Sequence, residues 1–332
     1  MNYDIIKILK LVVHHLHVME VDRVVCFELC EKGCHAQLAA MNSLTPAEFS
    51  SFRCLCRNAE GGDSRAAFQV AIRCSLGRGT DQSDRDAAKW CMRSAEDGCP
   101  QAQFYLAIMH FEGRGVHQDD RETLRWCRLS AKLGLPQALH FMGSMHARGL
   151  GGLAMSEEDA LYWYYKAAKT GYNASFYEIG CLFCYGSVKS PTGLRGDAEA
   201  FRWWRRAAEH GHAESQFKIS LQYAEGRGVS RNAAESAKWC AESARQGHRI
   251  AQFAMACKYK HGDGVVQNDM IALQYCRQSA LQNLLAEAQF NMGFAYESGL
   301  IVERSISTAI EWYQLASGHL FEGQFSLSLV TS

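Results

Sequence analysis

Apolar and small residues recur at helical spacing along most of this chain, in paired segments separated by glycine-containing turns. Segments such as AKWCMRSAEDG at 88–98 place apolar residues three and four apart among charged ones, which predicts an amphipathic helix that stops at the glycine. The segments that follow, such as AQFYLAIMHFEG at 102–113, carry a small residue, a large aliphatic one four later and a second small one at five. Small residues at these places let neighbouring helices approach closely. The pattern therefore predicts an all-α fold built from helix pairs.

Both segments repeat along the 332 residues. The aromatic residue of the first segment recurs at steps of 36, 37, 40, 36, 36 and 37, at Trp90, Trp126, Trp163, Trp203, Trp239, Tyr275 and Trp312. The glycine that ends the second segment follows the same period, at Gly77, Gly113, Gly149, Gly226, Gly262 and Gly299, with Gly186 in a divergent copy. Self-similarity at a period of 20 to 50 residues signals a solenoid rather than two ordinary domains.

This combination resembles the SEL-one-like repeat (SLR) family of tetratricopeptide-like α-solenoids, and the match runs over residues 52–318. The resemblance implies a right-handed α-α superhelix of about seven helix-pair repeats. We expect an N-terminal helical cap with a degenerate repeat fragment at 1–51, the solenoid at 52–318, and a C-terminal partial repeat or cap at 319–332. The array proper is predicted to start at TPAEF, with Pro46 at the first helical position. The stretch SVKSPTGLRGD, at 187–197, lengthens one loop.

Composition narrows the function. An apolar content of 48% excludes intrinsic disorder, and 35 basic against 35 acidic residues leave no basic stripe for nucleic acid. No apolar run approaches the roughly 20 residues that span a bilayer, so membrane insertion is not expected. The N-terminus interrupts its apolar residues with Asp4, Lys7 and Lys10, unlike a secretory signal. We therefore expect a cytoplasmic protein with free thiols.

The 14 cysteines raise the possibility of disulfides or metal sites. Four of them directly follow the repeat aromatic, in a slot that other copies fill with Tyr164, Trp204 and Tyr313; these are Cys91, Cys127, Cys240 and Cys276. A slot for soft or aromatic side chains behaves as a core position. Packed helices lie about 8 to 10 Å apart, whereas a disulfide needs Cα atoms within about 7 Å, so these four cannot pair or share one metal.

Other chemistry is weakly supported. Cys26, Cys30, Cys34 and His35, with Cys54 and Cys56, could form a zinc site, but their spacings match no strong ligand motif and packing is favoured. Packing is also favoured for Cys181 and Cys184, and polar surface for His14, His15 and His17. No HExxH, GxSxG or phosphate-loop motif is present, so we expect neither cofactor nor catalytic residues. The alternative, implied by the resemblance alone, is a weak hydrolase of the cysteine-rich SLR type.

Differences between the copies suggest a binding surface. With the first small residue of the second segment as position 0, positions 0, 2, 4, 5 and 8 are constrained, whereas positions 3, 6, 7 and 10 vary and share one arc of the helix. Stacked arcs form the extended binding strips of solenoids. The candidate partner-binding residues are Tyr105, Met109, Phe141, Met145, Leu182, Tyr185, Lys218 and Gln222. We expect a partner's apolar peptide or helix to dock across residues 105–185; the alternative is that some of these side chains pack within their own repeat. SLR proteins commonly act as adaptors, which favours a non-enzymatic scaffold that binds proteins along its concave face.

Overall fold

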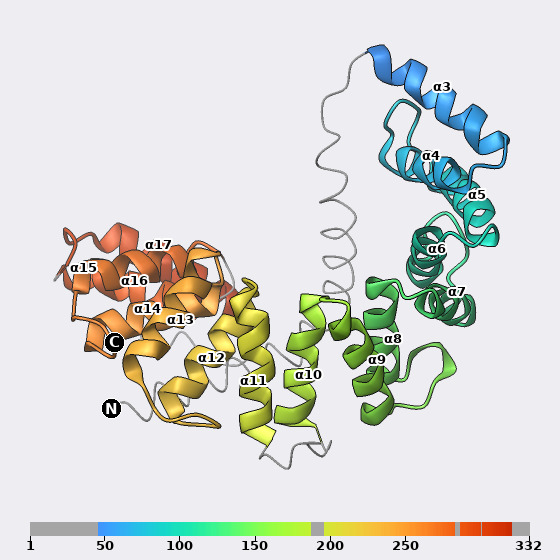
Figure 1. Ribbon diagram of the computed structural model, residues 1–332. Coiled ribbons are helices and arrows are strands. Elements are labelled where there is room, and N and C mark those ends of the chain that lie inside the picture. The colour runs from blue at the N-terminus through green and yellow to red at the C-terminus, as the bar shows by residue number, and fades with distance from the viewer. Residues whose placement is uncertain (1–45, 187–195, 283–285, 300, 321–332) are drawn as a thin grey trace. The chain divides into compact units, whose positions relative to one another are not determined.

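The computed structural model describes residues 46–186, 196–282, 286–299 and 301–320. Within these ranges the protein is all-α, with fifteen α-helices, one short 3₁₀ turn and no strand (Figure 1). This confirms the fold class predicted from the repeat pattern. The zinc candidates Cys26, Cys30, Cys34 and His35 lie outside the described residues, as do His14, His15 and His17.

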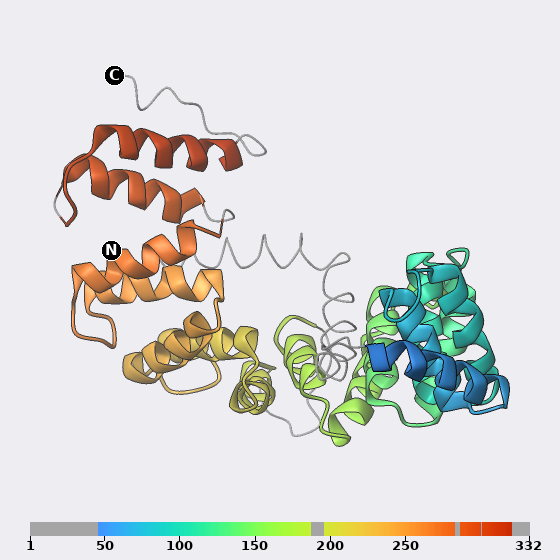
Figure 2. The same ribbon diagram turned by 90° about the horizontal axis from the view of Figure 1, so that it is seen from above.

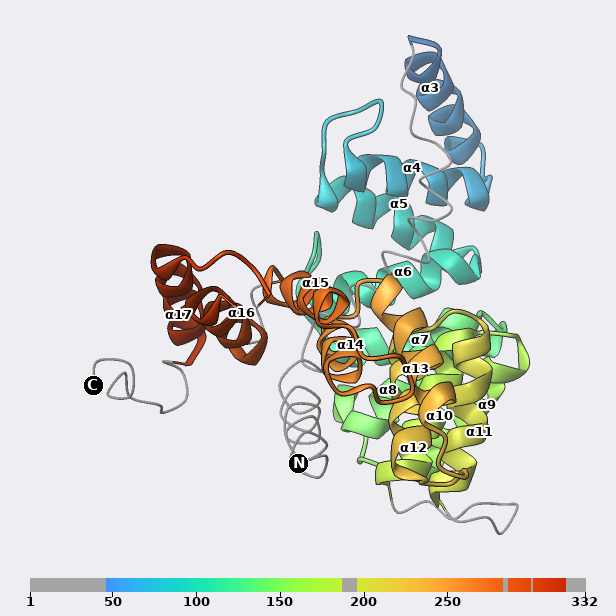
Figure 3. The same ribbon diagram turned by 90° about the vertical axis from the view of Figure 1, so that its left-hand side faces the viewer.

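The helices divide into two compact units, each a series of helix hairpins (Figures 1, 2 and 3). One unit contains α3 (Pro46–Glu60), α4 (Ser64–Leu76), α5 (Asp84–Glu96), α6 (Pro100–Glu112), α7 (Asp120–Lys132), α8 (Pro136–Arg148), the 3₁₀ turn η2 (Leu150–Gly152), α9 (Glu157–Lys169) and α10 (Asn173–Tyr185). The other contains α11 (Gly196–Glu209), α12 (Ala213–Glu225), α13 (Ala233–Arg245), α14 (Arg249–His261), α15 (Asp269–Ala280), α16 (Ala286–Ser298) and α17 (Ile306–Leu320).

Helix ends follow the sequence signals. The helices that carry the repeat aromatic begin after a polar cap whose side chain accepts hydrogen bonds from first-turn backbone N–H groups; these caps are Ser83, Asp119, Ser156, Asn232 and Asn268. The preceding helices end at left-handed glycines, as predicted, at Gly77, Gly113, Gly149, Gly226 and Gly262. Gly186 differs, with φ of −84°, so the divergent copy ends its helix without the left-handed turn. Helix α3 begins at Pro46, as expected.

The two helices of each repeat have different environments. We call first helices those that carry the small residue of position 0, as in AQFYLAIMHFEG; they are α4, α6, α8, α10, α12, α14 and α16. We call second helices those that carry the repeat aromatic and follow the first helices in each repeat; they are α5, α7, α9, α11, α13, α15 and α17. Second helices bury one face, as in α5, where Ala87, Ala88, Cys91, Ser94 and Ala95 are buried. First helices are buried almost all round; in α6 the eight residues from Ala102 to Met109 are all buried. A helix of this kind forms the core of the array.

The two helices of one repeat are joined by hydrogen bonds between residues 30 positions apart. In four repeats a buried serine of the second helix donates its hydroxyl to a carbonyl at the start of the first helix of the same repeat. These bonds are Ser94 to Ser64 at 2.6 Å, Ser130 to Pro100 at 2.7 Å, Ser243 to Ala213 at 2.8 Å and Ser279 to Arg249 at 2.9 Å. Because the serine side chain is buried, each bond helps fix how the two helices of a repeat pack against each other.

Consecutive repeats are joined at the turns that follow the first helices, where a second glycine comes two residues after the helix-ending glycine in the pattern GxG. The second glycine of the GxG turn, as in Gly115, Gly228 and Gly264, lies against the start of the preceding second helix. A Cβ at Gly264 would lie 2.0 Å from the carbonyl oxygen of Ala233. No larger residue fits there, which supports the structural role expected for these glycines.

Candidate partner-binding surface

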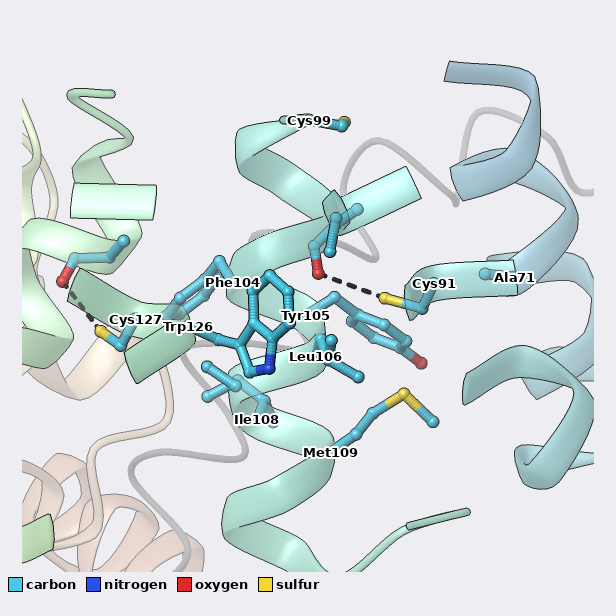
Figure 4. Close-up of a cluster of buried hydrophobic side chains, with 14 of the residues drawn as sticks. Ala71, Cys91, Cys99, Phe104, Tyr105, Leu106, Ile108, Met109, Trp126 and Cys127 are labelled. Atoms are coloured by element: carbon cyan, nitrogen blue, oxygen red, sulfur yellow. Dashed lines mark hydrogen bonds between the residues drawn. The ribbon is translucent and has the colours of Figure 1, made fainter. Parts of the chain in front are cut away.

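The structure places most of the predicted binding residues in the core. Tyr105, Met109, Phe141, Met145, Lys218 and Gln222 are buried, Leu182 is partly buried, and only Tyr185 is well exposed, at 57% of its surface. The expectation that positions 3 and 7 face solvent is therefore wrong in α6, α8 and α12. Figure 4 shows Tyr105 and Met109 within the cluster of α6 side chains, beside Cys91.

Contacts between neighbouring first helices explain this burial. The hydroxyl of Tyr105 donates to Ser75 Oγ of α4 at 3.1 Å, and its ring meets Phe68 edge-on at 6.0 Å. In α8, Phe141 is edge-on to Phe104 of α6 at 5.9 Å. Side chains at positions 2 and 3 of successive first helices thus pack against each other, so the arc that varies between copies varies to fit its neighbour.

The polar residues among the predicted partner-binding residues, Lys218 and Gln222, also make contacts within the protein. Gln222 donates from Nε2 to the backbone oxygen of Asp197 at 3.1 Å, and Lys218 Nζ lies 3.6 Å from Glu214 Oε1. Glu214 additionally contacts His248 Nε2 at 2.6 Å. Burial opposes the ionisation of Glu214, but the hydrogen bond from His248 and the positive charges nearby lower its pKa to about 2.

One position of the predicted arc does remain open. Position 10, the last turn of each first helix, is exposed in α6, α8, α10 and α14 and partly exposed in α4 and α12. Its residues differ in chemistry from repeat to repeat: Leu76, Glu112, Arg148, Tyr185, Glu225 and His261. We call these residues the helix-end row of their unit: Leu76, Glu112, Arg148 and Tyr185 in the unit from α3 to α10, and Glu225 and His261 in the other unit.

Charge in the row is influenced by a nearby carboxyl group. Loss of hydration raises the pKa of Glu178 in α10 to about 7, and the positive charge of Arg148 opposes this rise. The carboxyl of Glu178 is therefore partly protonated near neutral pH. The negative charge of Glu178 therefore offsets only part of the positive charge of Arg148, which lies one repeat before the exposed Tyr185.

The cysteine slot behaves as the sequence predicts. Cys91, Cys127, Cys240 and Cys276 are buried free thiols, and each donates to a backbone carbonyl of the next first helix, at 3.2 to 3.5 Å. Figure 4 shows two of these bonds. Burial raises the pKa of Cys240 and of Cys276 to about 12, so neither is a thiolate at neutral pH. Cys99 is also free and buried, and does not pair with Cys91.

Metal and membrane chemistry find no support in the described chain. Within residues 46–186 and the described parts of 196–320, no three His, Cys, Asp or Glu side chains are grouped as a metal site. Of the downstream zinc candidates, Cys54 is exposed and Cys56 partly buried. No helix in the same ranges has the length and apolar content needed to cross a membrane.

Comparison with known proteins identifies the repeat. The family model for the Sel1 repeat matches residues 64–99, 100–135, 136–172, 177–212, 213–248, 249–284 and 286–317. The chain belongs to the Sel1 repeat family. These seven matches agree with the seven repeats predicted from the aromatic and glycine periods, and each begins near a first helix.

Two solved structures share the Sel1 repeat architecture. One is c5321, a protective antigen of uropathogenic Escherichia coli with an SLR fold, at 30% identity and a TM-score of 0.69; the match covers 81% of this chain but only 56% of that one. The other is a Sel1 repeat protein from Oxalobacter formigenes, at 28% identity and a TM-score of 0.67, with 85% and 80% of the two chains covered. Among curated protein sequences, none matches this chain. Sel1 repeats generally form non-catalytic scaffolds for protein interactions.

Proposed function

We propose that this Sel1 repeat protein is a non-enzymatic scaffold that binds a partner protein across the helix-end row. The observation that carries the proposal is the exposure of position 10, in helices whose variable positions 3 and 7 are mostly buried. The buried positions 3 and 7 vary to fit the neighbouring first helix, whereas the exposed position 10 reads Glu112, Arg148 and Tyr185 in three successive repeats. A regular scaffold with one exposed, chemically distinct residue per repeat can recognise an extended segment of another protein.

The row favours a particular kind of partner in the unit from α3 to α10. Arg148 and Tyr185 are residue types enriched at binding hot spots, and Glu112 precedes them by one repeat. A segment that crosses from Glu112 towards Tyr185 would present a basic residue first, then an acidic one, then an apolar one. This order is the specificity that the proposal assigns to the scaffold. The apolar docking predicted along Tyr105 and Phe141 is replaced by contacts with side chains that a partner can reach.

Affinity capture with matched variants tests the proposal. The test variant carries Arg148→Glu and Tyr185→Ala, and the control carries Arg128→Glu and Tyr162→Ala on exposed faces of the second helices. We expect the wild type and the control to capture the same proteins from native lysate, identified by mass spectrometry, and the test variant to lose at least one of them. A test variant that is folded by circular dichroism and keeps every partner would rule out binding at the row.

A further inference from the structure

The last described repeat has an apolar face that earlier repeats cover. Position 2 of the first helix is 7%, 5%, 0% and 7% exposed in Phe104, His140, Phe217 and Phe253, but 49% exposed in Phe290. Position 6 shows the same contrast with α6 and α8, since Ile108 and Ser144 are buried and Phe294 is 53% exposed. In earlier repeats position 2 packs against the next first helix, as Phe68 does against Tyr105 and Phe104 against Phe141. The face around Phe290 and Phe294 therefore lacks the helix that its counterparts pack against.

The second helix of that repeat contributes to the same face. The ring of Tyr313 in α17 lies 5.2 Å from that of Phe290 and directly over Gly293. Tyr313 occupies the cysteine slot, and the slot residues Cys91, Cys127 and Cys240 are fully buried under position 0 of the next first helix. Tyr313, in contrast, is only partly buried. Phe290, Phe294 and Tyr313 form what we call the terminal face.

The sequence beyond α17 contains a segment with the pattern of a first helix. Residues 323–330 read GQFSLSLV, against AQFNMGFA at 288–295, SQFKISLQ at 215–222 and AQFAMACK at 251–258. All four share the order of a small residue, Gln, Phe, a variable residue, a large aliphatic residue and a second small residue. The Gln lies 12 residues after Trp312, compared with 13 or 14 in those repeats.

We propose that residues 323–330 dock on the terminal face as an eighth first helix. Gly323 would lie at position 0, where the absence of a side chain leaves room for the Tyr313 ring that replaces the smaller cysteine of other repeats. Leu327 would lie at position 4, whose counterparts Leu106, Met142, Ile219, Met255 and Met292 are at most 1% exposed. Phe325, at position 2, would point away from the array, as Phe290 does when no further helix follows.

Hydrogen–deuterium exchange on the full chain tests this assignment. In the wild type we expect the amides of 324–330 to exchange on the order of tenfold more slowly than an unstructured reference peptide of the same sequence. Leu327→Asp should abolish that protection and speed exchange in α16, because it places a charge against the terminal face. Phe325→Asp, with the same chemical change two residues away, should leave both unchanged. Unaltered exchange in α12 and α13 serves as the control for folding.

Three outcomes would overturn the proposal. The first is a wild type whose 324–330 amides exchange at the reference rate. The second is equal loss of protection in both aspartate variants, which would mean that the segment makes apolar contact without the helical register of a repeat. The third is protection that disappears on dilution together with a halving of the mass in solution, which would mean that a second copy of the chain covers the terminal face.

Discussion

The position directly after the repeat aromatic, called the slot above, is filled by cysteine in some repeats and by a ring in others, within the same helix packing. Cys91, Cys127, Cys240 and Cys276 donate to the next helix, whereas Tyr164 and Tyr313 extend over a glycine of their own repeat. A Cβ at Gly143 would lie 2.6 Å from the Tyr164 ring, and one at Gly293 would lie 2.6 Å from Tyr313. A larger slot residue is therefore matched by a smaller partner, which conserves the volume of the core.

Burial of the slot predicts thiol reactivity. At pH 8 we expect N-ethylmaleimide to modify the exposed Cys54 in the native protein and to leave Cys91, Cys127, Cys240 and Cys276 unmodified until denaturant is added. Peptide mass spectrometry after timed labelling measures this directly. Labelling of Cys240 at the rate of Cys54 in the native state would show that the slot is open to solvent.

The ion pair of Glu214 predicts a dependence of stability on pH. Its pKa of about 2 lies below the 4.5 of an unperturbed glutamate, so ionised Glu214 stabilises the fold above pH 4.5 and that contribution is lost as the pH falls towards 2. Glu214→Gln should therefore lower the Tm at pH 7, and the difference from the wild type should shrink on acidification. Glu209→Gln, in an exposed pair with Arg205, is the control and should change the Tm little. A constant Tm difference between pH 7 and pH 3 would contradict the assignment.

At the scale of the helix, sequence patterns predicted where elements begin and end but not which face of a first helix is open. Polar caps and glycines are local signals, so the helix limits and the GxG turns followed from them. Burial of Tyr105 and Phe141 depends on the neighbouring repeats, and a count of constant against variable positions cannot distinguish a solvent-facing site from one that varies to fit its neighbour. The proximity of position 10 to the turn was the available signal for the helix-end row.

The two glycine types predict different costs for the same substitution. Gly98→Ala, where φ is +84° and no atom lies within 4 Å of the added Cβ, should destabilise by about 1 to 2 kcal/mol. Gly264→Ala, with φ of +76°, adds a contact of 2.0 Å with backbone and should cost clearly more. Chemical denaturation of the two variants compares them. Equal free energies of unfolding would show that the turn at Gly264 is not packed against the start of α13 at Ala233.

Packing between first helices predicts a large effect at a predicted binding residue. Phe141→Ala should destabilise the unit from α3 to α10 by about 3 to 5 kcal/mol, because it opens a cavity between Phe104 and Phe111. Urea unfolding followed by circular dichroism measures the change, with Tyr162→Ala on the exposed face of α9 as the control. A loss below 1 kcal/mol would indicate that Phe141 is exposed and would restore the original strip as a candidate surface.

At the scale of the whole molecule, the seven Sel1 repeats bury most of their first-helix side chains, so the residues proposed to bind lie at the helix ends and on the last repeat. The repeat period alone was sufficient to predict the family and the fold class, since neither depends on detailed side-chain contacts. The partner-binding surface depends on what the array leaves exposed, which is the helix-end row with Glu112, Arg148 and Tyr185. Phe290 and Phe294 are also exposed apolar side chains, and they lie at the terminal face, where we propose that residues 323–330 dock.

The most direct test of the central claim is hydrogen–deuterium exchange of the full chain with and without a captured partner. Binding across the helix-end row predicts slower exchange at 109–116, 145–152 and 182–186, where the first helices end, and unchanged exchange in the second helices α5, α7 and α9. Protection confined to the second helices, with the ends of the first helices unchanged, would contradict the account.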